Sequence, residues 1–366
     1  QIEAFQYMLK HIPMLKLQFD YEYQPYLSEK EVVLKKWFLE SEPSMEKLSE
    51  WLSVPFSFFK EPLCDIRYCL KDETVEFYIK VHHILLDGYS IALWARKFFE
   101  IYQAMKQGEK CPELSDDGFT ETMFQRQKVS DRDMEWLKKQ ISFEHEESWR
   151  LKTIHPGKIK ASRKIYNIPN DLYNKMKKVE RIHGFSAEVL LTAALGIYIS
   201  KVTGSQNVVL GRSLVNRRKK EMSMLGTKVN VLPVTMKLDK ENNFFKFCEI
   251  IRGIFYDMMC HSAAPFQQYL EKEHNRESFY DIMISYRSEK YIPVIEGIEQ
   301  IEIPSLELEL PMRIFLNEFS EEMRIEIKYQ ISCYEEQEIQ ALWERILVIL
   351  NQGLENKKVQ QTHKAC

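Results

Sequence analysis

Apolar and polar residues alternate over residues 75–82, and this period of two predicts a β-strand. Over residues 91–105 the apolar positions instead recur at steps of three and four, which predicts a helix that Ser90 can cap. His82 and His83 therefore stand where a strand ends and the chain turns toward a helix. Open α/β sheets place their chemistry at strand ends of this kind.

The two histidines are expected to have different roles. Neighbouring side chains on a strand point to opposite faces, so His82 and His83 cannot both enter one cleft, and only one is expected to act as an acid or base. If Val81 faces the core, so does His83. Asp87 can orient the backbone or an imidazole, or pair with a distant cation. Gly88 allows a turn conformation that other residues resist.

The rest of the chain continues to alternate between the two periods. Apolar positions at helical spacing predict helices over residues 1–9, 170–183, 187–203 and 334–350, and β-rich runs predict strands over 163–168, 207–214, 298–310 and 314–329. This pattern predicts an α/β sandwich with a mixed sheet. The length of the chain predicts two lobes.

Composition excludes several classes of protein. Apolar residues make up 45% of the chain and charged residues 29%, which is typical of a globular protein, and a net charge of −3 gives no argument for nucleic acid binding. The longest apolar run is too short to cross a membrane, and no signal peptide opens the chain. The seven cysteines are scattered without a C-x-x-C pair, so we expect no disulfide framework, no metal site and a cytoplasmic location.

The arrangement His82-His83-x-x-x-Asp87-Gly88 resembles the HHxxxDG signature of condensation domains of nonribosomal peptide synthetases, which the wider chloramphenicol-acetyltransferase-like acyltransferases share. Further stretches resemble family motifs in the family's order: Pro55–Phe58, Glu61–Arg67, Gly211–Arg217, Leu225–Pro233, Ser262–Gln267 and Phe279–Tyr286. The resemblance implies two chloramphenicol-acetyltransferase-like α/β sandwich lobes in a V-shaped arrangement, with mixed sheets and a tunnel through the cleft. It also implies that the polar residues 109–156 cross between lobes of residues 1–156 and 157–366.

Two basic positions near the start are expected to be structural. Residues 10–19 resemble a family stretch whose first arginine is thought to pair with the signature aspartate, and His11 falls on that arginine. His11 would then have to serve Asp87, more weakly and depending on pH. Arg67 matches a family arginine, with a surface cation on a strand as the alternative. The family normally has a further strand and helix before this point, so the chain looks shortened at its start.

The resemblance also implies roles at the signature and beyond it. His83 is the expected base or transition-state hydrogen-bonding group, and His82 is its structural neighbour within the catalytic motif. Asp87 orients the loop, and Gly88 lets it turn and offers a backbone N–H. Along the substrate channel the resemblance implies three residues, of which the first is expected to cap a helix more than touch substrate: Ser90, Arg217 and Asn230.

The activity implied by the resemblance is amide bond formation between a carrier-bound donor acyl or peptidyl thioester and a carrier-bound aminoacyl acceptor. Upstream and downstream peptidyl carrier proteins would be the partners, together with an adenylation domain of the same synthetase. These carriers supply the phosphopantetheine arms, so the chain needs no cofactor of its own. Nothing resembles the G-x-S-x-G motif of serine nucleophiles, which favours direct transfer without an acyl-enzyme.

Three alternatives remain open at this point. A stand-alone acyltransferase of the same superfamily would use coenzyme A or a single carrier. An epimerisation domain shares the two histidines, although its extra acidic and glycine features after Arg217 are missing here. A catalytically degenerate domain would only dock carriers or tailoring enzymes.

Overall fold

The computed structural model describes residues 1–37, 43–71, 74–114, 118–119, 124, 130–141, 159–274, 278–289, 301, 303 and 307–355. By its contacts the chain forms two compact units. The first includes Gln1–Lys128 and Arg217–Lys228, and the second includes Val129–Asn216, Val229–Glu289 and Gln300–Cys366. No single cut describes this division, because the Arg217–Lys228 segment joins the first unit. The boundary predicted near residue 156 lies outside the described residues and stays a prediction.

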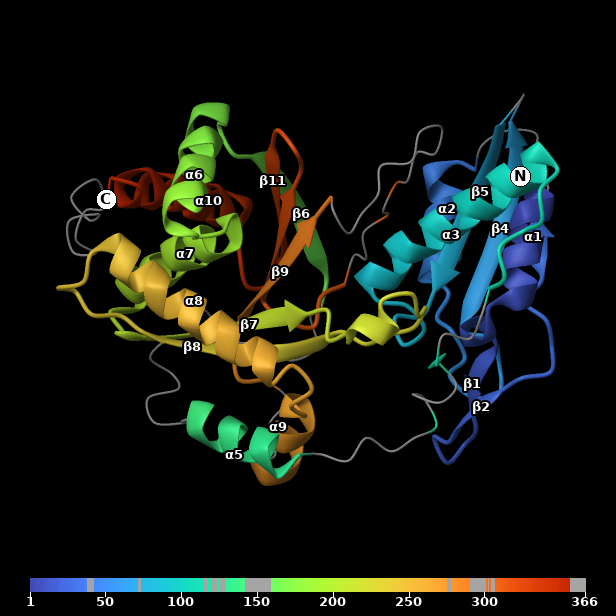
Figure 1. The fold of residues 1–366 in the computed structure, drawn as a ribbon, viewed down its shortest axis with the longest axis horizontal. Helices are drawn as coiled ribbons and strands as arrows, with labels where there is room; N and C mark the ends of the chain where they lie inside the picture. Colours follow the sequence, from blue (N-terminus) through green and yellow to red (C-terminus); the bar gives the residue numbers. More distant parts are fainter. Residues whose placement is uncertain are drawn as a thin grey trace. The chain divides into compact units, whose positions relative to one another are not determined.

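The first unit is built on a small sheet with the strand order β3-β4-β5 (Figure 1). Its strands are β3 (Leu34–Lys36), β4 (Cys64–Lys71) and β5 (Thr74–Val81); β3 and β4 are parallel, whereas β4 and β5 are antiparallel. A separate antiparallel pair is formed by β1 (Leu17–Phe19) and β2 (Pro25–Leu27). The predicted strand over residues 75–82 is therefore confirmed as β5.

Helices cover both faces of this small sheet. On one face α1 (Ile2–His11) and α3 (Gly88–Gln107) pack together, and the ring of Phe5 stacks on Phe77 of β5 at 4.3 Å. On the other face α2 (Met45–Ser53) brings Trp51 against β4, where its indole N–H donates to Asp65 at 2.7 Å. Alternate residues of β4 and β5 therefore point into an aromatic core and into a polar, aromatic layer under α2.

The second unit contains a six-stranded mixed sheet in the order β6-β11-β10-β9-β7-β8. Its strands are β6 (Ala161–Asn167), β7 (Asn207–Leu214), β8 (Asn230–Lys237), β9 (Ile282–Ser288), β10 (Met312–Glu318) and β11 (Met323–Gln330). Strand β9 is parallel to both β7 and β10, and the other pairings are antiparallel. The predicted α/β fold with a mixed sheet is thus confirmed.

The helices of the second unit are α5 (Asp131–Gln140), α6 (Asn170–His183), α7 (Ala187–Thr203), α8 (Phe244–Cys260), α9 (Phe266–His274) and α10 (Glu336–Gly353). Helix α7 is apolar around most of its circumference and is buried accordingly, next to α8 and α10 (Figure 1). Its N-terminus is capped as predicted, since the Ser186 hydroxyl accepts the Val189 N–H at 3.3 Å.

One predicted strand proves to be a hairpin. Residues 314–329 contain the last part of β10 and most of β11, which pair antiparallel and are joined by a turn closed by a hydrogen bond from the Phe319 N–H to the Glu322 carbonyl at 2.9 Å. Most of the strand predicted over residues 298–310 lies outside the described residues. In the described part, Glu307 makes an isolated bridge with Lys160.

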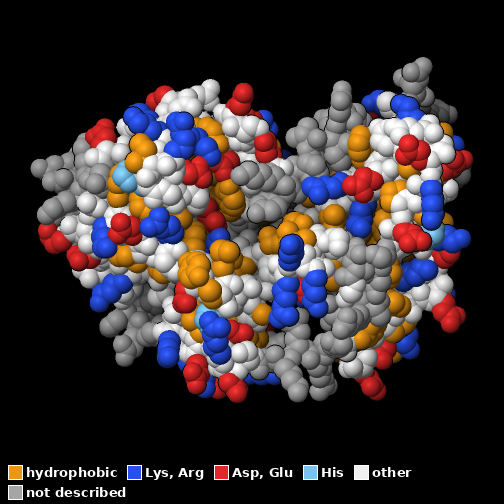
Figure 2. Space-filling view, viewed as in Figure 1, with side chains coloured by type: hydrophobic (Ala, Val, Ile, Leu, Met, Phe, Trp, Pro, Cys, Tyr) orange, Lys and Arg blue, Asp and Glu red, His pale blue; other side chains and the backbone are white. Residues whose placement is uncertain are grey.

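The surface mixes charges of both signs. Figure 2 shows Lys and Arg side chains next to Asp and Glu side chains, with apolar side chains between them. This fits the small net charge of −3. Across the described ranges, no single helix is long and apolar enough to cross a membrane. The six cysteines that the structure describes carry free thiols.

Candidate active site

The two histidines lie in a short connection between β5 and α3. The β-ladder extends one residue beyond β5, because the His82 N–H donates to the Leu63 carbonyl at 2.8 Å. A turn follows, closed by the Leu85 N–H on the His82 carbonyl at 3.0 Å, and the fully buried Leu85 anchors it in the core. His83 stands exposed on this turn. The strand-parity argument that turned His83 toward the core is wrong here, because the strand ends at Val81.

His82 is half-buried and packs against two phenylalanine rings. Its ring lies edge-on to Phe56 and Phe58, with centroid distances of 6.3 and 5.9 Å. Burial, and secondarily the nearby charge of His83, lower the pKa of His82. Its Nδ1 accepts the backbone N–H of Ile84 at 3.2 Å, an acceptor role that only the unprotonated nitrogen can have.

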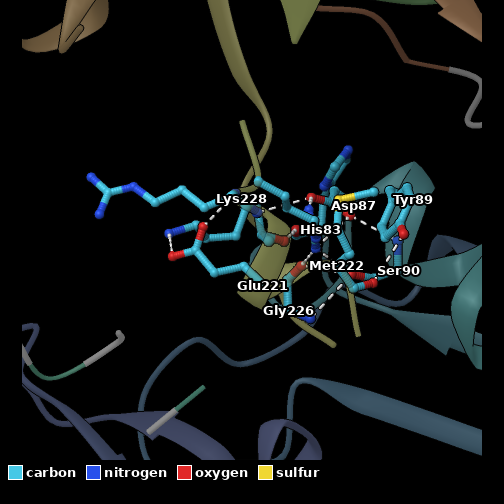
Figure 3. A network of polar contacts seen from close by, with 11 residues as sticks. His83, Asp87, Tyr89, Ser90, Glu221, Met222, Gly226 and Lys228 are labelled. Carbon is cyan, nitrogen blue, oxygen red and sulfur yellow. Dashed lines mark hydrogen bonds and ion pairs between the residues drawn. The ribbon is translucent and has the colours of Figure 1, made fainter. Parts of the chain in front are cut away.

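Asp87 is buried and fully engaged in polar contacts (Figure 3). Its Oδ1 caps α3 by accepting the Ser90 N–H at 2.9 Å, and its Oδ2 accepts the Lys228 N–H at 2.8 Å. The Arg217 guanidinium donates to both oxygens, at 2.8 and 3.2 Å. Burial alone would raise the pKa of Asp87, but the hydrogen bonds and charge of Arg217 and the two backbone N–H groups hold it below its ordinary value.

Arg217 is the cation that pairs with the signature aspartate. Its side chain is fully buried, which corrects the prediction that it lines a channel. Besides Asp87 it donates to the Ser90 hydroxyl at 2.7 Å and to the Gly226 carbonyl at 2.5 Å. Its guanidinium also lies 4.8 Å from the centre of the Tyr89 ring. The role expected of His11 therefore belongs to a residue of the 217–228 segment.

Ser90 is also buried and neither caps the helix nor lies at an open surface. Helix α3 begins at Gly88, with Asp87 as its cap, so the predicted cap was misplaced. The Ser90 hydroxyl donates to the Gly226 carbonyl at 2.6 Å and accepts the Gly226 N–H at 3.1 Å. Ser90 therefore holds the 217–228 segment against the start of α3.

Further contacts join the same segment to the signature turn. The Tyr89 hydroxyl donates to the Met222 carbonyl at 2.9 Å, and the Thr227 hydroxyl donates to the His83 carbonyl at 2.6 Å (Figure 3). Lys228 also forms an ion pair with Glu221 at 3.3 Å within the segment. The sequence analysis did not identify Thr227, although the Leu225–Pro233 motif that contains it was a usable signal.

The predicted pairing of His11 with Asp87 is wrong. His11 is exposed at the end of α1, where its Nδ1 lies 2.7 Å from the Tyr7 carbonyl and its ring packs at a tilt against Tyr7, with centroids 4.2 Å apart. Gly88 likewise differs from its prediction. It is the first residue of α3 and is not among the described residues with positive φ, so the turn does not depend on a glycine conformation there.

Arg67 lies in the polar layer under α2. It donates to Asp65 at 2.8 Å, and its guanidinium packs on the rings of Trp37 and Trp51. Burial would raise the pKa of Asp65, but hydrogen bonds from Trp51, Arg67 and Lys35 lower it to about 2. These contacts are structural and do not involve the histidine turn.

Asn230, the other predicted channel residue, belongs to the second unit. Its side-chain amide donates to the carbonyls of Ser262 and Ala264, both at 2.8 Å, and its Oδ1 accepts the Val231 N–H at 3.0 Å. The Asn230 side chain therefore holds the connection between α8 and α9, a structural contact that differs from the predicted channel role.

The chemistry available on the turn is that of an exposed imidazole. The nearby thiol of Cys64 is no nucleophile at neutral pH, because burial raises its pKa to about 12. In the described part of the chain, no group of three His, Cys, Asp or Glu residues could hold a metal ion. His83 can exchange protons with a bound molecule, while His82, Asp87 and the 217–228 segment fix the turn that carries it.

Comparison with known families gives a match over nearly the whole chain. A family model described as "Condensation domain" matches residues 2–364. A plipastatin synthase of Bacillus subtilis (strain 168) is 24% identical over 254 residues, which is 65% of this chain and 10% of that protein. Surfactin synthase subunit 1 of the same organism is 22% identical over 372 residues, 93% of this chain and 10% of that protein. The chain thus spans about a tenth of the length of these relatives.

Solved structures share the fold at low sequence identity. The first condensation domain of the calcium-dependent antibiotic synthetase, in complex with a substrate analogue, has a TM-score of 0.77 and 18% identity, and the match covers 98% of this chain and 89% of that one. The epimerization domain from the third module of tyrocidine synthetase B has a TM-score of 0.74 and 14% identity, with 98% and 89% covered. The X-domain from teicoplanin biosynthesis has a TM-score of 0.77 and 14% identity, with 97% and 87% covered.

Proposed function

Because the chain belongs to the condensation-domain family, we propose that it joins two carrier-bound substrates in a nonribosomal peptide synthetase. It forms an amide bond between a donor acyl or peptidyl thioester and the amine of an aminoacyl thioester. The observation that carries this proposal is that His83 is exposed, on a turn that leads directly to the buried Asp87–Arg217 ion pair.

In this proposal His83 acts on the proton of the attacking amine. The amine nitrogen attacks the thioester carbon, the C–N bond forms and a tetrahedral intermediate carries the negative oxygen. His83 accepts the amine proton, the C–S bond breaks as the intermediate collapses, and the departing thiolate takes up that proton from the His83 imidazolium. A positioned base of this kind typically contributes roughly 10²–10⁴-fold to the rate. Holding both thioesters next to each other also raises the rate, because it makes a bimolecular step effectively unimolecular.

The other residues of the site act through the position of His83. Neutral His82 holds the turn, and the ionised Asp87 holds both the start of α3 and the 217–228 segment. The acyl group passes directly between the carrier-bound substrates. The lack of a G-x-S-x-G motif and the raised pKa of the buried Cys64 thiol both support this route.

The partners in this proposal are the upstream and downstream peptidyl carrier proteins, and an adenylation domain of the same synthetase. The carriers bring the phosphopantetheine arms, so the chain contributes no cofactor. The small share of each curated relative that the chain spans supports this assignment, because those synthases extend far beyond the matched region. The free thiols of the described cysteines fit a reducing cytoplasm.

The test loads two peptidyl carrier proteins with aminoacyl thioesters and follows the dipeptidyl product by mass spectrometry. Wild type should form the product, and His83→Ala should form it roughly 10²–10⁴-fold more slowly. The matched control is His11→Ala, which removes another exposed histidine of the same unit and should leave product formation unchanged.

The same assay separates the alternatives. Transfer from coenzyme A to a small acceptor, without a second carrier, would identify a stand-alone acyltransferase. Exchange of the α-proton of a single loaded thioester in deuterated buffer would identify an epimerisation domain, whose fold this chain also shares. Carrier binding with neither reaction would identify a docking domain, and each of these three results would contradict the proposal.

A further inference from the structure

The peptide group that joins His83 to Ile84 is hydrogen-bonded by side chains on both sides. Its carbonyl accepts the Thr227 hydroxyl at 2.6 Å. Its N–H donates to Nδ1 of His82 at 3.2 Å. One contact comes from His82, which precedes His83 in the sequence, and the other comes from the distant 217–228 segment.

These two hydrogen bonds fix the backbone of the turn that carries His83. His83 is exposed, and among the described residues none makes a hydrogen bond to its ring. The place of its Cα–Cβ bond is therefore set by the backbone of the turn. Loss of the Thr227 hydrogen bond would let this backbone shift against the 217–228 segment and carry the imidazole with it.

Thr227 itself is held firmly by the residues on either side of it. The preceding Gly226 makes two hydrogen bonds with the buried Ser90 hydroxyl, at 2.6 and 3.1 Å. The following Lys228 N–H donates to Asp87 at 2.8 Å. Since Ser90 and Asp87 both belong to the start of α3, the Thr227 hydroxyl is fixed relative to the same helix that follows the histidine turn.

We propose that Thr227 is a positioning residue for His83, and that its hydroxyl, together with Nδ1 of His82, holds the turn backbone from which the His83 imidazole acts. The catalytic consequence rests on the function proposed above. The lowered pKa of His82, caused first by burial, supports the arrangement because it keeps Nδ1 available as an acceptor. Thr227 thus stands between Lys228, whose N–H binds Asp87, and the backbone carbonyl of His83.

Two substitutions of Thr227 separate the effect of its hydroxyl group from that of its branched shape. Thr227→Val keeps the branched shape and removes the donor, whereas Thr227→Ser keeps the donor. Thr235→Val is the matched control, because the Thr235 hydroxyl donates to the Gln140 carbonyl at 3.1 Å within the second unit. All three variants are expected to fold with melting temperatures close to wild type, since each changes one hydroxyl or one methyl group.

The first measurement is the steady-state rate of product formation with loaded carriers. Thr227→Val should lower kcat about tenfold, the factor that one neutral hydrogen bond corresponds to, with KM unchanged. Thr227→Ser should restore kcat, and Thr235→Val should leave it at the wild-type value. An unchanged kcat in Thr227→Val would overturn the catalytic part of the proposal.

The second measurement needs no substrate. In protein labelled with ¹³C on the histidine rings, Thr227→Val should shift or broaden the His83 ring signal, Thr227→Ser should restore it, and Thr235→Val should not affect it. An unmoved His83 signal in Thr227→Val overturns the positioning role, whatever the rates. A wild type that forms no product, with the His83 signal responding as expected, would refute the proposed function and leave the positioning role standing.

Discussion

Removal of the buried cation next to Asp87 should strongly destabilise the first unit. The Arg217 side chain is 0% exposed and that of Asp87 2%, and their atoms approach to 2.8 Å. Arg217→Met leaves a buried carboxylate without its counterion, and Asp87→Ala leaves a buried guanidinium. Breaking a buried pair in this way costs about 3–5 kcal/mol for each single variant. The free energy of unfolding should fall by that amount in both.

The double variant tests whether these losses come from the pair itself. With both charges removed, no unpaired ion is left inside the protein, so the double variant should cost about 2 kcal/mol less than the sum of the singles. Hydrogen exchange of the α3 amides, followed at increasing urea concentrations, measures the free energy of unfolding of the first unit separately from that of the second. Strictly additive losses, or single losses below about 1 kcal/mol, would refute the reasoning.

An exposed ion pair of the same unit provides the control for burial, and the pH dependence tests the charge of Asp87. Lys71→Ala breaks an exposed ion pair of the same unit, with side chains 51% and 31% exposed, and should cost no more than about 1 kcal/mol. The folded-state pKa of Asp87 is lowered, so its charged form contributes stability above the ordinary carboxyl range and loses it as pH falls through the folded pKa. Arg217→Met removes a group that lowers the pKa of Asp87, so the variant's carboxyl is neutralised at a higher pH than in wild type. The difference in stability between the two should therefore shrink as the pH falls, beginning before wild type loses stability.

Three further variants should each lower the melting temperature followed by circular dichroism. Ser90→Ala leaves the Gly226 N–H without its hydroxyl partner in the core and should cost about 1–3 kcal/mol, so an unchanged melting curve would contradict its structural role. Gly226→Ala places a Cβ 2.9 Å from the Phe119 ring at a φ of +147° and should cost about 1–3 kcal/mol; a stable variant would show that the segment can rearrange. Asp65→Asn should cost about 1–2 kcal/mol at pH 7, and the loss should disappear between about pH 4 and pH 2; a pH-independent difference would disprove the charged role.

Much of the fold could be predicted from local pattern. The buried run over residues 207–214 and the capped helix after Ser186 were correctly predicted because their signals lie within a few residues of each other. The hairpin of β10 and β11 was missed because its turn at residues 319–322 contains no glycine, proline or asparagine, and its only sequence signal is the short polar run Ser320-Glu321-Glu322. A turn without these residues leaves little trace in a periodicity.

Only the local frame of the site was predictable. The sequence predicted the strand before the histidines and the helix after Asp87, because these signals lie close together. It could not show that the cation for Asp87 comes from Arg217 and not from His11, because only tertiary folding brings a residue 130 positions away into contact. The strand-parity argument failed for a local reason, since β5 ends two residues before His83.

The most direct test of the account is the single-turnover rate of dipeptidyl product formation from two loaded carriers, measured for wild type, His83→Ala and His11→Ala. We expect His83→Ala to be slower by roughly 10²–10⁴-fold and His11→Ala to match wild type. Equal rates in wild type and His83→Ala would contradict the assignment of the exposed imidazole as the group that accepts the amine proton.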